Sequence, residues 1–186
     1  MRTTVVYASK YGFTEQYARW IAEDLEAGLY EIRAISAEAL RQSDAVVFGG
    51  GLYAGGVNGL SALLKHFDAI RGKPFVLFTC GVADPQEPGN VRHIRECLHK
   101  ALPPEAEAAA SIFHLRGGLD YKRLTFVHRA MMAMLKRMIV KKAPGDRSEE
   151  DRQILATYGK AVNFTDRAAV KPIVSLIQSQ NPPQPV

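Results

Sequence analysis

The sequence predicts an α/β protein built on a doubly wound, five-stranded parallel sheet with strand order 2-1-3-4-5. Short apolar runs alternate with amphipathic helical patterns along the chain, and this alternation is typical of a parallel sheet with helices on both faces. Three of the loops that follow these runs are rich in glycine. The 186 residues, 47% hydrophobic and 23% charged, suit a soluble domain with a sizeable core.

Strands are expected where β-branched and apolar residues concentrate, at 2–8, 29–35, 44–49, 74–79 and within 106–115. The runs at 44–49 and 74–79 are almost continuously apolar, as in strands that are covered on both faces. Helices are expected at 14–27, 59–70, 87–102 and 148–164 from their 3.6-residue periodicity. Ser148, with Asp151 three residues later, resembles a capping box.

We expect one domain over residues 1–170, including a basic amphipathic insert at 120–147, and a C-terminal tail at 171–186 with a loose, proline-rich end. The first residues read as a strand rather than a signal peptide. No apolar stretch approaches the roughly 20 residues of a membrane-spanning helix. Cys80 and Cys97 are far apart and have no metal-ligand spacing, so a cytoplasmic chain with reduced thiols and no metal site is expected.

The loop after the first strand is the strongest candidate site. A helix begins there, and the exposed N–H groups and partial positive charge of a helix N-terminus attract phosphate. Gly12 permits a tight turn, and the hydroxyls of Ser9 and Thr14 add donors. The loop lacks both the dinucleotide fingerprint and the Gly-Lys-Ser/Thr motif, which favours a mononucleotide. An ordinary strand–helix turn capped by a hydroxyl remains the alternative. The predicted phosphate-binding residues are Ser9, Lys10, Tyr11, Gly12, Phe13 and Thr14.

Two further loops are expected at the same edge of the sheet, and glycine there would let the backbone approach a flat ligand. Tyr53 is a candidate for stacking on a ring, or else an aromatic residue of a surface loop. Cys80 is more consistent with a small buried residue than with a redox thiol, because no second cysteine is near it in sequence. The predicted ring-binding residues are Gly51, Leu52, Tyr53, Ala54, Gly55, Cys80, Gly81 and Val82.

Residues 122–142 form a basic segment with seven positive charges and no acidic residue, whereas the rest of the chain carries a small net negative charge. In a helix, one face would hold Leu124, Val127, Met131, Met134, Leu135 and Met138. Such a helix can lie on an anionic membrane or dock in a partner's groove. The alternative is a surface helix whose methionines pack on the domain. Nucleic acid is not expected, because the basic residues lie beside methionines rather than among interleaved aromatic residues.

The phosphate loop resembles the flavodoxin motif Thr/Ser-x-Thr/Ser/Tyr-Gly-x-Thr, with Phe13 where asparagine is most common. The basic insert, with 116–122 and 157–166, is similar to bacterial menaquinone-dependent protoporphyrinogen oxidases of the flavodoxin-like family, and this similarity extends from Ser9 to Asp166. The resemblance implies an FMN cofactor, a hydrophobic reductant, a quinone acceptor and a role in heme biosynthesis. It also suggests porphyrinogen contacts for Arg116 and Tyr121.

Three functions stay open. The first is an FMN-dependent, quinone-linked oxidoreductase that touches the inner face of the membrane. The second is a flavodoxin-type electron carrier with a redox protein partner, although such carriers are usually strongly acidic and this chain has a net charge of +5. The third is a non-enzymatic domain with weak or lost FMN binding. No catalytic acid or base is identified from the sequence.

Overall fold

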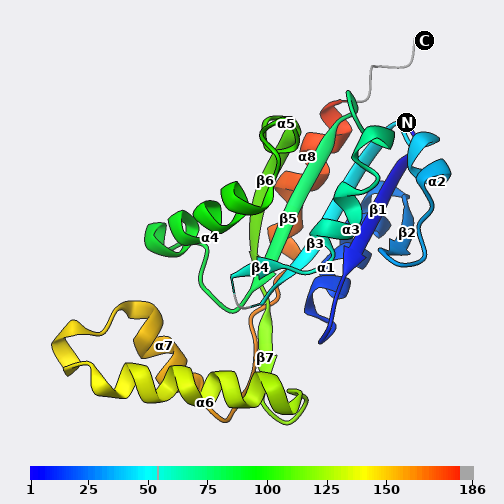
Figure 1. The fold of residues 1–186 in the computed structure, drawn as a ribbon. Helices are drawn as coiled ribbons and strands as arrows, with labels where there is room; N and C mark the ends of the chain where they lie inside the picture. Colours follow the sequence, from blue (N-terminus) through cyan, green and yellow to red (C-terminus); the bar gives the residue numbers. More distant parts are fainter. Residues whose placement is uncertain (54, 181–186) are drawn as a thin grey trace. The chain divides into compact units, whose positions relative to one another are not determined.

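A computed structural model describes residues 1–53 and 55–180 and confirms the predicted fold class. Five parallel strands form the central sheet in the order β2-β1-β3-β5-β6, which is the predicted order 2-1-3-4-5 (Figure 1). The bounds are Thr3–Ala8 for β1, Gly28–Glu31 for β2, Ala45–Tyr53 for β3, Phe75–Gly81 for β5 and Ala110–Arg116 for β6. The two-residue strand β4, Gly56–Val57, pairs antiparallel with the end of β3.

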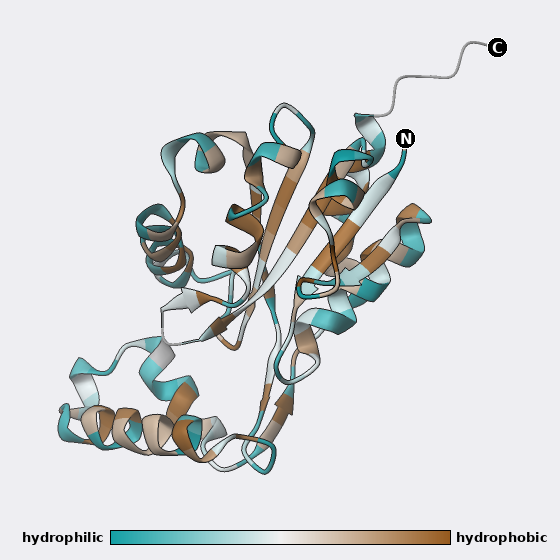
Figure 2. Ribbon diagram, turned by 45° about the vertical axis from the view of Figure 1, so that its right-hand side comes forward, coloured by the Kyte–Doolittle hydropathy of each residue, from teal (hydrophilic) through white to brown (hydrophobic). Residues whose placement is uncertain are grey.

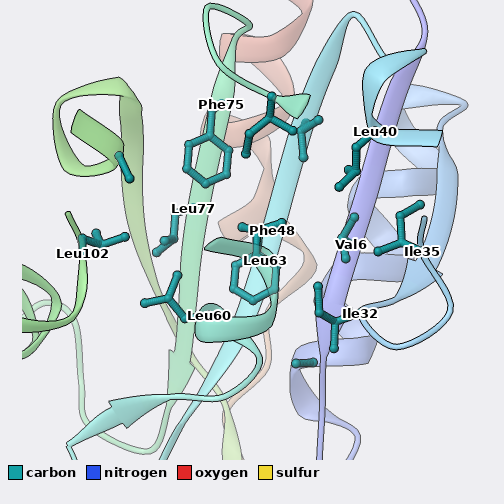
Figure 3. Packing of buried hydrophobic residues seen from close by; sticks show 14 of the residues in the cluster. Val6, Ile32, Ile35, Leu40, Phe48, Leu60, Leu63, Phe75, Leu77 and Leu102 are labelled. Atoms are coloured by element: carbon teal, nitrogen blue, oxygen red, sulfur yellow. The ribbon is translucent and has the colours of Figure 1, made fainter. Parts of the chain in front are cut away.

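Helices cover both faces of this sheet because its strands carry apolar side chains on both sides. Neighbouring strand residues such as Val5 and Val6 belong to opposite hydrophobic clusters. One cluster contains the side chains of α1 and α8; the other contains those of α2, α3, α4 and α5, with Phe48 and Leu77 from the strands (Figure 3). The bounds are Phe13–Leu25 for α1, Ala37–Arg41 for α2, Leu60–Leu64 for α3, Pro88–Ala101 for α4, Pro104–Ala109 for α5 and Lys171–Ser179 for α8.

The chain divides into two compact units, and residues 118–164 form the second. This second unit contains the predicted insert at 120–147. Its helices are α6, Phe126–Lys141, and α7, Glu149–Thr157, and a 3-10 turn, Pro144–Asp146, lies between them. Strands β7, Gly118–Asp120, and β8, Ala161–Asn163, pair antiparallel. The capping box is present as expected: Ser148 and Asp151 exchange side chain to backbone hydrogen bonds of 3.1 and 3.0 Å.

The local predictions differ from the structure mainly at element ends. The helix expected at 59–70 is α3 followed by a 3-10 turn at Phe67–Ala69. The helix expected at 148–164 ends at Thr157, and Gly159 then adopts a left-handed φ of 78° before β8. The expected tail at 171–186 instead begins with α8, preceded by a 3-10 turn at Arg167–Val170. This helix buries Ile173 and Ile177 in the core, and such apolar burial is what holds it on the sheet.

Candidate functional site

The candidate site lies at the carboxyl edge of the parallel sheet. Strands β1, β3, β5 and β6 run in the same direction, so the segments that follow them meet at this edge. In doubly wound sheets, ligands bind at this edge beside the point where the strand order reverses. Here that point lies between β1 and β3, because β2 is on the outer side of β1.

The first of these segments turns sharply into α1. Gly12 has a left-handed φ of 96°, a conformation that side chains other than glycine rarely adopt. Its N–H donates to Ser9 Oγ at 3.0 Å, and its carbonyl accepts from the N–H of Gln16 at 2.9 Å. No side chain caps α1. A 13-residue helix therefore presents its first turn without a capping side chain, which suits an anion.

Thr14, in the first turn of α1, points into the protein rather than outward. Its side chain is 2% exposed and hydrogen-bonds to the Cys80 thiol at the end of β5. Burial raises the pKa of that thiol to about 12, against a smaller opposing effect of the Thr14 hydrogen bond. A thiol that stays protonated is a poor nucleophile, so Cys80 has the properties of a buried packing residue.

Tyr53, at the end of β3, reaches back to residues 9–14, the predicted phosphate-binding loop. Its phenol oxygen accepts a hydrogen bond from the backbone N–H of Lys10, and its ring lies edge-on to Tyr11 with centroids 5.8 Å apart. Burial is the main reason that the pKa of Tyr53 is raised to about 12. The hydroxyl is therefore a neutral member of the loop's own hydrogen-bond network. The structure brings Ser9 to Thr14 together with Gly51, Tyr53 and Cys80.

The glycines at 49–51 have a different explanation from the expected one. They lie within β3 rather than in a loop, because the strand continues to Tyr53. A Cβ on Gly49 would stand 2.1 Å from the Phe78 ring, and one on Gly50 would stand 2.8 Å from the carbonyl oxygen of Asn58. A Cβ on Gly51 would stand 2.8 Å from the Tyr53 ring and 3.2 Å from Thr14 Oγ1. Packing within the protein therefore requires these glycines, independently of any ligand.

The segments after β5 and β6 are fastened to each other and to α1. The Gly117 N–H donates to the Gly81 carbonyl at 2.6 Å, and a Cβ on Gly117 would stand 2.7 Å from Cys80 Sγ. Arg116 forms an ion pair of 2.7 Å with Asp84 and donates to the Val82 carbonyl at 3.3 Å. These contacts fix the backbone around the predicted residues Gly81 and Val82.

Sequence reasoning missed the residues that tie this edge together. The Tyr17 hydroxyl donates to the Arg116 carbonyl at 2.7 Å and accepts from the Asp166 N–H at 3.1 Å. Tyr17 was expected only as one of the core residues of α1. The partners are 99 and 149 residues away in sequence, and no local pattern signals such a pairing. Arg116 and Asp84 form an ion pair although they are 32 residues apart, and no local sequence pattern predicts this pairing either.

The remaining predicted residues lie at the margin of this cluster. Leu52 packs against Gly81, since a Cβ added to Gly81 would stand 3.0 Å from Leu52 Cδ1. Gly55 turns the chain between β3 and β4 with a φ of 78°, and its nearest side chain is Cys97, 3.8 Å from a built Cβ. Ala54 lies outside the described residues. Within those residues no cluster of His, Cys, Asp or Glu could hold a metal ion.

Comparison with known proteins assigns the family. A family model described as a flavodoxin domain matches residues 4–148, which is most of the chain. The chain belongs to the flavodoxin domain family. The match begins in β1 of this flavodoxin domain and ends just before α7, so it includes the predicted phosphate-binding loop, the carboxyl edge of the sheet and α6.

Solved structures similar to this flavodoxin domain include an archaeal flavodoxin, at 17% identity over 62% of this chain and 83% of that one, with a TM-score of 0.43. Flavodoxin 1 from Bacillus cereus is 22% identical over 62% and 83% of the two chains, with a TM-score of 0.40. An NADPH-quinone reductase from P. pentosaceus is 13% identical over 70% and 92%, with a TM-score of 0.45. No curated protein matches the chain.

Proposed function

We propose that this flavodoxin domain binds FMN, with the phosphate at residues 9–14, and passes electrons from a hydrophobic reductant to a quinone. The observation that carries the proposal is the first turn of α1, which has no capping side chain and lies at the carboxyl edge beside the strand-order reversal. Ser9 adds a partly exposed hydroxyl to these backbone donors, so the donor set is chemically suited to phosphate. Bound FMN would supply the redox chemistry, and the chain would supply binding and orientation.

The finer assignment, an oxidase of the protoporphyrinogen type, rests on family membership and on the resemblance of the insert. The charge distribution favours it over a soluble carrier. The first unit, residues 1–117 and 165–186, contains equal numbers of acidic and basic residues, and the whole net charge of +5 comes from residues 118–164. A carrier that docks on basic partners needs an acidic surface, which this composition does not favour.

Tyr53 has a specific place in this proposal. Its hydroxyl accepts the Lys10 N–H, which is one of the backbone donors that a phosphate in the loop would use. Phosphate binding therefore competes with the Tyr53 hydroxyl for that donor. If the ring also stacks on the isoalloxazine, Tyr53→Phe should keep stacking and remove the competition, whereas Tyr53→Ala should lose stacking. We expect FMN to bind several-fold more tightly to Tyr53→Phe and more weakly to Tyr53→Ala.

The phosphate assignment is tested by comparing FMN with riboflavin, which lacks the phosphate. Binding is followed by the visible spectrum of protein recovered from gel filtration and by fluorescence titration. The change Ser9→Ala removes the hydroxyl of this loop that is not buried. We expect it to weaken FMN binding about tenfold or more and leave riboflavin binding unchanged, since each charge-assisted hydrogen bond is worth about 1.5–3 kcal/mol.

Ser111→Ala, an exposed serine on β6, serves as the control, and it should change neither affinity. If Ser9→Ala weakens FMN and riboflavin binding equally, the phosphate does not bind at this loop. The electron-transfer assignment needs a separate assay, in which FMN-loaded protein is mixed with protoporphyrinogen and menaquinone. Turnover supports the oxidase. Retained FMN without turnover favours the electron carrier, and no retained FMN favours a domain that has lost the cofactor.

A further inference from the structure

The large exposed apolar side chains of this protein are concentrated on one helix. Among the described residues eight large hydrophobic side chains are exposed, and six of them belong to α6. They are Phe126, Val127, Met131, Met134, Met138 and Val140, with exposed fractions from 38% to 85%. In Figure 2, apolar segments recur along the whole length of α6. A concentration of this kind on a soluble domain usually marks a binding surface.

Four of these side chains form a single line, which we call the apolar ridge: Val127, Met131, Met134 and Met138. Their spacing of four, three and four residues puts them on one face of a helix. The 16 residues of α6 make it about 24 Å long, so the ridge follows most of its length. The ridge is thus a continuous apolar strip rather than scattered exposed residues.

A different face of α6 is already packed within its own unit. Ile139 is 1% exposed, and the Ile139 carbonyl accepts from Arg147 Nε at 3.3 Å. Lys136 Nζ lies 4.2 Å from the ring centroid of Tyr158, beyond the end of α7. These contacts hold the helix from one side. The apolar ridge is a second apolar face, which the packing of residues 118–164 leaves exposed.

Positive charge accompanies the ridge. Residues 118–164 contain ten basic and five acidic side chains, and all five acidic ones lie outside α6. In the helix, Arg137 and Lys141 are exposed and fall beside the ridge on the 3.6-residue period, and Arg123 is exposed just before the helix begins. Basic side chains next to exposed apolar ones are typical of helices that lie in the interface of anionic bilayers.

We infer that α6 is a docking surface for an anionic lipid bilayer, with the apolar ridge buried among the acyl chains and the basic residues at the headgroups. Charge complementarity selects this occupant: a second copy of the chain would bring two basic segments together. Among the described residues no helix is long and apolar enough to span a membrane, so α6 would lie in the membrane plane.

The charge contribution is tested by sedimenting the full chain with vesicles of phosphatidylcholine, with and without 30% phosphatidylserine. We expect binding to need phosphatidylserine and to fall as salt rises from 50 to 500 mM, because screening shortens the reach of the charges. Neutralising Arg123, Arg137 and Lys141 to Gln should weaken binding on the order of a hundredfold, since each contributes roughly a fivefold factor at an anionic surface. The matched control neutralises three exposed basic residues of the first unit: Arg33, Arg92 and Lys100.

The apolar contribution is tested with Met131→Ser, Met134→Ser and Met138→Ser combined. This variant should keep the wild-type melting temperature and lose at least tenfold in affinity for anionic vesicles. Met134→Trp should be quenched by brominated lipid far more than the wild-type protein, whose one tryptophan is Trp20 in α1.

Four results would overturn the inference. The first is equal binding to vesicles with and without phosphatidylserine, and the second is no binding to either. The third is a dimer in the absence of lipid that the serine variant converts to monomer, which would make the ridge a self-association surface. The fourth is a large loss of stability in the serine variant, which would show that the ridge packs within the chain. None of these tests requires FMN, so they are independent of the proposed function.

Discussion

The two compact units of this chain differ in whether their apolar side chains are buried or exposed. In the first unit, residues 1–117 and 165–186, apolar side chains from both faces of the sheet fill two hydrophobic clusters. In the second, residues 118–164, the longest helix leaves a line of valine and methionine side chains exposed. The charge also differs, since the second unit holds the entire net charge of +5.

This difference teaches how to interpret an amphipathic pattern. The same periodicity predicts α1 and α6, and in α1 the apolar face is the buried face: Tyr17, Ala18 and Ile21 are at most 1% exposed. In α6 most of the predicted apolar face is exposed and forms the apolar ridge, while a different face of the helix is packed. Periodicity shows that a helix has an apolar face, but the surrounding volume of the fold decides whether that face is covered.

The largest expected effect tests this contrast through stability. Phe48, in β3, is fully buried, and Phe48→Ala should lower the free energy of unfolding by about 3–5 kcal/mol. Met134, in α6, is 61% exposed, and Met134→Ala should change it by less than about 0.5 kcal/mol. Urea unfolding followed by circular dichroism measures both. A loss above 2 kcal/mol for Met134→Ala would mean that the ridge is part of a core, and the contrast would fail.

A second pair of changes sharpens the explanation of the glycines in β3. A Cβ on Gly49 would overlap the buried Phe78 ring, so Gly49→Ala should destabilise the protein by about 1–3 kcal/mol through overpacking. Gly89 is in the first turn of α4 with no atom within 4 Å of a built Cβ, so Gly89→Ala should be neutral or stabilise by up to about 1 kcal/mol. Thermal unfolding without ligand measures both. Equal changes in stability for Gly49→Ala and Gly89→Ala would show that packing against Phe78 does not require glycine at position 49.

The sequence predicts the central sheet well because its strands are apolar runs with a clear period. The runs at 44–49 and 74–79 each begin one residue before β3 and β5 and cover the first five residues of each strand. The continuation of β3 through Gly50 and Gly51 to Tyr53 was missed, since glycine normally weakens a strand. Only the fold shows why glycine is present there: the Phe78, Val57 and Tyr53 side chains occupy the space of a Cβ.

The sequence predicts where the candidate site lies in the fold, but it does not predict the hydrogen bonds that connect its residues. Ser9 to Thr14 follow the first strand, and strand order alone puts them at the carboxyl edge. The hydrogen bond of the Lys10 N–H to Tyr53 and the bridge of Tyr17 between Arg116 and Asp166 link distant positions. Such pairings depend on tertiary distances, which no local spacing encodes.

A third prediction concerns the pH dependence of the first unit. Arg95 Nε donates to His114 Nε2 at 3.1 Å, so His114 is neutral and its Nδ1–H donates to Thr79 Oγ1 at 2.8 Å. Burial, with a smaller contribution from Arg95, lowers the pKa of His114 to about 4. The unfolded chain takes up this proton near pH ~6.5, so stability should fall as the pH drops from ~6.5 towards 4, by at most about 1.4 kcal/mol per pH unit.

Urea unfolding at a series of pH values measures this slope. His114→Gln should flatten it across the same range, and the exposed His93→Gln should not. An unchanged slope in His114→Gln would assign the acid sensitivity to other groups. Thr79 and His114 lie in β5 and β6 of the first unit. The change in slope caused by His114→Gln therefore reports acid destabilisation of the first unit and not of the second.

The smallest expected effect asks whether the two units unfold together. Ser148→Ala removes the capping box at the start of α7 and should cost about 1 kcal/mol. Lys142 lowers the pKa of Asp151 in the same cap, so this local stability is present above the ordinary pKa of Asp and is lost as the pH falls through the lowered value. Native-state hydrogen exchange in Ser148→Ala measures protection in α7 and in β5 separately. We expect faster exchange in α7 with unchanged protection in β5, because the side chain contacts of this cap lie within residues 118–164. Equal loss in both would mean that one cooperative transition governs the chain, and the exposed ridge would then belong to the same folding unit as the sheet.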